Sequence, residues 1–115
     1  MLSFTDIREK NVARSEKDWE HPLNSWSIAE WGNALAGECG EACNAAKKIL
    51  RLDTNIRVDL ADGNREDYLD ELANELADTF LYLDLMAAAA GIDLETSIIK
   101  KFNRKSKEIG SEIRL

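Results

Sequence analysis

Apolar residues recur every three or four positions along most of the chain, and the alternation typical of strands is nearly absent. Such spacing makes one face of a helix apolar. The first helix ends before His21-Pro22, because proline cannot continue a helix. Ser27 and Glu30 form a capping box at the start of the second helix. The pattern predicts an all-α fold with four helices, over residues 3–19, 27–52, 65–90 and 94–112.

A polar connector, residues 53–64, separates the second and third helices. Asp62-Gly63-Asn64 is a turn signal within it. Ile56, Val58 and Leu60 alternate with polar residues. This alternation predicts either a short extended piece or a helical turn.

The second half of the third helix is apolar nearly all round. Between Thr79 and Ala90 the only charged residue is Asp84. A helix of this kind is buried on most of its sides. Since so small a bundle cannot enclose it alone, we expect a four-helix bundle that is completed by oligomerisation, as a homodimer or homotetramer.

Size and composition indicate one globular domain over residues 1–115, with 44% apolar and 32% charged residues. The net charge of −7 disfavours a nucleic-acid binder, whose surface is usually basic. No segment has the layout of a signal peptide or reaches the ~18 apolar residues of a membrane span. We therefore expect a cytoplasmic protein without a membrane partner. Cys39 and Cys43 are expected to be small core residues.

The acidic chain carries a basic segment, residues 100–107, with five lysines and arginines. Such a segment suits a site that holds metal at one end and phosphate at the other. It is equally typical of a cationic helix end, which the helix dipole favours.

Two pairs of carboxylates stand at helical spacing in apolar surroundings. Glu38 and Glu41 lie on the second helix, and Glu75 and Asp78 on the third. Residues three apart share a helix face. Unpaired carboxylates on faces that should pack would cost several kcal/mol each. A hard divalent cation would compensate these charges best. Mg²⁺ prefers oxygen ligands and usually keeps several bound waters, which substrate phosphates can replace.

The carboxylates have two other interpretations. Their spacing is also typical of solvated acids on amphipathic helices. A di-iron bundle would require Glu-x-x-His on two helices, and the only histidine, His21, lies outside both pairs. Gly37 and Gly40 weaken the second helix by up to ~1 kcal/mol each, which is understandable if a ligand or another helix approaches closely.

Over roughly residues 19–110, the chain resembles the MazG-like family of all-α nucleoside triphosphate pyrophosphatases, and within it the dCTP-pyrophosphatase-like branch. The matching segments are Ala34–Glu41, Glu71–Tyr82, Gly91–Leu94 and Lys100–Lys105. Gly37 stands where many members have an acidic residue, and Lys105 where the family has an asparagine.

The resemblance implies a hydrolase of (d)NTPs that depends on Mg²⁺, with Mn²⁺ as an alternative, and that is active as a dimer or tetramer. It implies that Glu38, Glu41, Glu75 and Asp78 are metal ligands. It also implies that Tyr82 and His21 contact the nucleotide and that Lys101 binds phosphate. His21 could equally be only a residue that stops a helix.

The chemistry expected is attack of water on the α-phosphorus, with pyrophosphate leaving. Glu38 or Glu41 would orient or deprotonate the water. Lys48, on the face of Glu41, and Lys101 with Lys105 would hold the distal phosphates, unless they are solvated surface residues. Trp31 could stack on the base, although a tryptophan there is more often core. The alternative function is a catalytically silent helical oligomer that binds a nucleotide or a protein partner.

Overall fold

A computed structural model describes residues 1–60 and 62–115, except for the side chain of Leu60. Its helices are α1 (Phe4–Lys17), α2 (Ile28–Thr54), α3 (Arg65–Ala89) and α4 (Leu94–Glu108), with 3-10 turns η1 (Leu23–Ser25) and η2 (Val58–Leu60). No strand occurs among the described residues, which confirms the all-α class. Of the connector predicted over 53–64, Ala61 lies outside the described residues.

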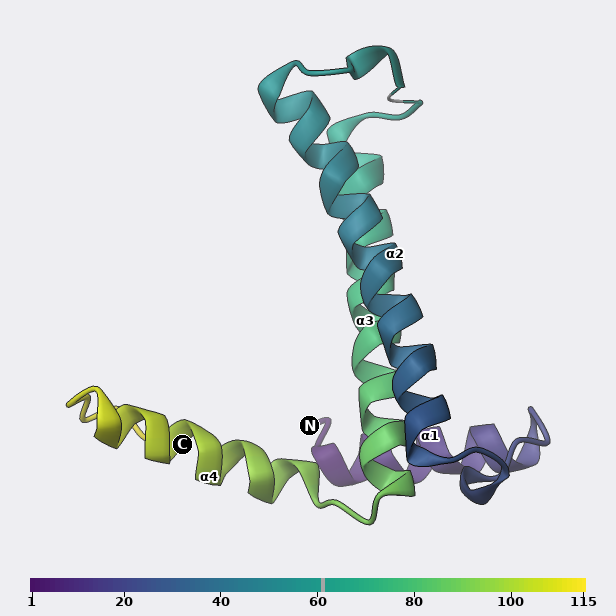
Figure 1. Ribbon diagram of the computed structural model, residues 1–115, viewed down its shortest axis with the longest axis vertical. Helices are drawn as coiled ribbons and strands as arrows, with labels where there is room; N and C mark the ends of the chain where they lie inside the picture. Colours follow the sequence, from purple (N-terminus) through teal and green to yellow (C-terminus); the bar gives the residue numbers. More distant parts are fainter. Residues whose placement is uncertain (61) are drawn as a thin grey trace.

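The two longest helices, α2 and α3, form an antiparallel hairpin and pack along their length (Figure 1). Ala42 and Ala45 are buried on α2, and small side chains let two helix axes approach closely. Each helix begins with a capping box, at Ser27 for α2 and at Asn64 for α3. The caps satisfy N–H groups that have no partner inside the helix.

Helix α1 crosses the base of the hairpin and is attached to α3 largely by polar groups (Figure 1). Arg8 Nε donates to Asp84 Oδ1 at 2.8 Å. Asn11 Nδ2 donates to the carbonyl oxygen of Leu81 at 2.8 Å. The rings of Phe4 and Phe80 add a tilted contact, with centroids 6.0 Å apart. Asp84, the only charged residue in the apolar half of α3, therefore anchors α1 to α3.

Two glycines end the last two helices. Gly91 (φ 68°) and Gly110 (φ 72°) adopt the left-handed conformation that favours glycine. The next residue in each case donates back into the helix, Ile92 N–H to Ala87 and Ser111 N–H to Ser106, both at 2.8 Å. As a result α4 ends at Glu108, four residues before the predicted end, because Gly110 closes it.

The single chain is open rather than compact. Its radius of gyration is 17.6 Å, whereas about 13 Å is usual for a domain of this length. Helix α4 points away from the hairpin (Figure 1) and packs extensively on none of the other described helices. Cys39 and Cys43 are both exposed on α2, so the expectation that they are core residues was wrong: their side of α2 is left uncovered by the described residues.

We predict that Arg8→Leu lowers the free energy of unfolding by about 3 kcal/mol, because it leaves the buried Asp84 carboxylate without its cation. The control Lys10→Leu changes an exposed lysine on the same helix and should cost less than about 0.5 kcal/mol. Urea unfolding at equal protein concentration measures both. Equal losses in the two variants would show that Asp84 does not depend on Arg8.

Candidate metal centre

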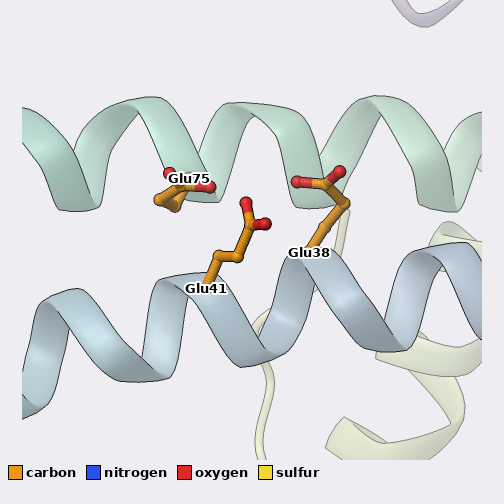
Figure 2. Close-up of side chains that lie close together, drawn as sticks. All are labelled: Glu38, Glu41 and Glu75. Atoms are coloured by element: carbon orange, nitrogen blue, oxygen red, sulfur yellow. The ribbon is translucent and has the colours of Figure 1, made fainter.

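Three carboxylates meet where α2 and α3 face each other. One carboxylate oxygen from each of Glu38, Glu41 and Glu75 lies within 4.8 Å of the others. Glu38 and Glu41 reach across from α2, and Glu75 comes from α3 (Figure 2). Spacing of three residues on α2 and the antiparallel packing of α3 are what bring them together. A bundle of this kind can hold a cation between facing helices.

Asp78, the fourth predicted ligand, is not part of this cluster. It is exposed on α3, one turn after Glu75. Its negative charge nevertheless raises the pKa of both Glu38 and Glu75. Asp78 therefore stands within electrostatic range of the three carboxylates, although the structure does not bring its oxygens among theirs.

The cluster lacks compensating charge. A hydrogen bond with Glu41 raises the pKa of Glu75 most, followed by burial and by the charges of Glu41, Asp78 and Glu38. Burial raises the pKa of Glu38 most, followed by the charges of Glu41 and Asp78. Within the described part of the chain, no lysine or arginine forms an ion pair with any of the three. One oxygen of Glu75, Oε2, is buried without a hydrogen-bond partner.

These features fit a hard divalent cation. The donors are all carboxylate oxygens, which Mg²⁺ and Mn²⁺ accept readily. The unpartnered Oε2 of Glu75 has a free lone pair for such an ion. Glu38, Glu41 and Glu75 could hold the cation directly, with Asp78 beside them.

Lys48, a predicted phosphate contact, is held by α3. Its Nζ lies 2.9 Å from Oε1 and 3.2 Å from Oε2 of Glu71. It also lies 5.5 Å from the ring centroid of Tyr68. The hydrogen bond with Glu71 is the first cause that raises the pKa of Lys48. Its charge is therefore largely matched within the chain.

Tyr82 and the predicted base contacts lie beyond the carboxylates, toward the base of the hairpin. Burial, and then the charges of Glu38 and Asp78, raise the pKa of the half-buried Tyr82, which places its hydroxyl near the acids. His21, Trp26 and Trp31 form an aromatic cluster with ring centroids 4.2–4.9 Å apart. Trp31 is only 1% exposed and its Nε1 donates to the Leu23 carbonyl oxygen at 2.9 Å. In the single chain Trp26 offers more open surface than Trp31 does.

Lys101 and Lys105 are exposed on α4, which points away from the hairpin (Figure 1). The structure does not bring them to the carboxylates within one chain. Lys105 instead lies 3.5 Å from Glu108 of its own helix.

Two cations near the carboxylates, Lys47 and Arg51, were missed at the level of sequence. They line one groove with Glu41, Glu75 and the predicted Lys48. For Arg51 a signal was available, because it follows Lys48 by three residues and so shares a helix face with it.

No family model, no curated protein and no solved structure matches the chain. None of the described helices combines the length and the apolar character needed to cross a membrane.

Raised glutamate pKa values give a pH dependence with a definite sign. The folded state binds more protons than the unfolded state between the ordinary value of 4.5 and the raised values of Glu38 and Glu75. The stability of the metal-free protein should therefore fall as pH rises through this window. Glu38→Gln/Glu75→Gln should lose this contribution, and the control Glu16→Gln/Glu112→Gln should keep it. Thermal unfolding in EDTA from pH 5 to 7.5 measures it. Parallel profiles for the wild type and both variants would contradict the assignment.

Proposed function

We propose that the protein is a Mg²⁺-dependent nucleoside triphosphate pyrophosphohydrolase of the MazG-like kind, which converts (d)NTP and water to (d)NMP and pyrophosphate. The observation that carries the proposal is the meeting of Glu38, Glu41 and Glu75 within 4.8 Å across two helices, with no ion pair to a lysine or arginine among the described residues. The proposal concerns nucleotide-pool control or cleansing, since the reaction removes triphosphates.

The carboxylates have two tasks in this reaction: they hold the metal, and one of them activates the attacking water. When Mg²⁺ is bound, it would supply positive charge that offsets the negative charge spreading over the phosphate oxygens. The oxygen of a water bonds to the α-phosphorus while the bond to the bridging oxygen breaks, and pyrophosphate leaves with that electron pair. Glu41 or Glu38 orients the water and takes its proton. Glu75 and Asp78, on α3, provide the negative charge that faces the metal from the helix opposite Glu38 and Glu41.

The nucleoside is assigned to the side of Tyr82. This residue is near Glu38 and Asp78, and an aromatic ring offers a face for base stacking. His21 belongs to the aromatic cluster at the same end of the hairpin.

We predict pyrophosphate release from at least one nucleotide in a panel of canonical and modified (d)NTPs with Mg²⁺, and its loss in EDTA. Glu75→Gln/Asp78→Asn should lower kcat about 100-fold or more, because the variant lacks one proposed metal ligand, Glu75, and the negative charge of Asp78 beside it. Glu16→Gln/Asp70→Asn makes the same change of charge on exposed residues and should retain activity. A folded wild type that releases pyrophosphate from no nucleotide would refute the enzyme proposal in favour of a silent binding bundle.

The same proposal includes a homo-oligomer. The chain exposes 8065 Å², whereas about 6,300 Å² is usual for a monomer of this mass. The excess on one chain is about twice the ~800 Å² that each partner buries in a standard protein interface. A single chain thus leaves uncovered the surface that a second copy could bury.

The uncovered surface includes a row of apolar side chains at regular helical spacing. Leu69, Leu76 and Leu83 follow one another at intervals of seven on α3 and are 42%, 53% and 36% exposed. A seven-residue repeat is the spacing that packs one helix against another. Apart from chain neighbours and the backbone of their own helix, Gly37 and Gly40 on α2 have no described atom within 4 Å of where a Cβ would stand. A partner helix is the occupant that both features suit.

We predict that Leu76→Lys converts the oligomer to monomer at micromolar concentration, because a charge would be buried at the centre of the α3 seam. Leu2→Lys, at an exposed position near the N-terminus, should leave the assembly intact. Sedimentation equilibrium distinguishes the species. A monomeric wild type, or an oligomeric Leu76→Lys protein, would rule out this seam as the interface.

A further inference from the structure

A groove of about 430 Å³ runs from the carboxylates toward the connector end of the hairpin. Glu41 and Glu75 line one end, and Lys47 and Arg51 line the other. Its volume is within the range of about 300–1,000 Å³ that small-molecule sites occupy. The groove is thus acidic at the candidate metal centre and basic beyond it.

The basic end keeps unmatched charge. Lys48, between the two ends, is neutralised by Glu71 at 2.9 Å. Lys47 and Arg51 form no ion pair with any residue that the structure describes. Arg51 is half-buried, so its guanidinium is screened less by water than that of a fully exposed arginine. A half-buried, unpaired guanidinium favours an anion as its neighbour.

The spacing fits a chain of phosphates. Lys47 follows Glu41 by six residues on α2, a rise of about 9 Å. Side chains on a helix lean toward its N-terminus, so Lys47 and Arg51 lean toward Glu41. Flexible side chains of this length can therefore meet a phosphate chain that starts at the carboxylates.

Resting on the proposed function, we propose that this groove binds the polyphosphate of the substrate, with its terminal phosphates at Lys47 and Arg51. The carboxylates hold the metal-bound part of the chain, and the leaving pyrophosphate remains between Glu41 and Arg51. The nucleoside then lies on the other side of the carboxylates, toward Tyr82. The phosphate-binding cations of the chain itself are these two residues of α2, because Lys101 and Lys105 are on the diverging α4.

The test is binding of Mg²⁺ with pyrophosphate, measured by calorimetry on the full chain. Lys47→Gln/Arg51→Gln should weaken binding about tenfold or more, since charge-assisted hydrogen bonds to phosphate are lost. The affinity of this variant for a nucleoside monophosphate should stay within about twofold of the wild-type value, because that ligand does not reach the basic end of the groove. Lys17→Gln/Lys107→Gln, an equal change of charge on exposed residues elsewhere, should behave as the wild type.

Hydrolysis by the same proteins separates this proposal from the proposed function. If the wild type hydrolyses a triphosphate and Lys47→Gln/Arg51→Gln matches the control in KM and in pyrophosphate affinity, the groove proposal is overturned and the activity stands. If the wild type hydrolyses no triphosphate, the proposed activity is overturned, and pyrophosphate binding is then the only test of the groove proposal. In that case, binding lost only in Lys47→Gln/Arg51→Gln supports the groove, and no binding by the wild type overturns it.

Discussion

Antiparallel packing of α2 against α3 is the constraint on which the rest of the structure depends, because it forces like charges together. Helices of 27 and 25 residues are about 40 Å long, and their contact sets one register. In that register Glu38 and Glu41 face Glu75. Repulsion among the three opposes the packing, as the raised pKa values of Glu38 and Glu75 show. The hairpin therefore holds a site that a cation would stabilise.

The same register also orders charge along the hairpin. Because the helices run in opposite directions, Glu71, one turn before Glu75, lies beside Lys48, which follows Glu41. This ion pair reinforces the register and neutralises Lys48. Lys47 and Arg51 are then the cations of the groove that form no ion pair with any described residue. Acids near the middle and free cations toward the connector follow from one packing arrangement.

Helices and carboxylate pairs could be predicted because they follow from local spacing. The starts of α2, α3 and α4 coincide with capping residues that the sequence displays: Ser27, Asn64 and Asp93. The direction of α4 could not be predicted, since it depends on what covers its apolar side. The position of Asp78 outside the cluster and the pairing of Lys48 with Glu71 also depend on side-chain conformations and register across two helices. The ion pair of Arg8 and Asp84, which anchors α1, joins residues 76 positions apart. Local spacing in the sequence cannot reveal a contact over such a separation.

On the proposed function, metal binding and assembly would both offset the same weakness of the single chain. The hairpin buries few large side chains: among its helices only Trp31 and Leu85 are large, apolar and under 2% exposed. Burial of large apolar side chains is the main source of stability, so a hairpin with so few has little surplus against carboxylate repulsion. A ligand that binds only the folded state adds RT ln(1 + [L]/Kd) to stability, and a partner copy that covers the α3 seam adds burial. On the proposed function, substrate with its cation and the second subunit therefore stabilise the same two helices, one from the groove and the other at the exposed leucines of α3.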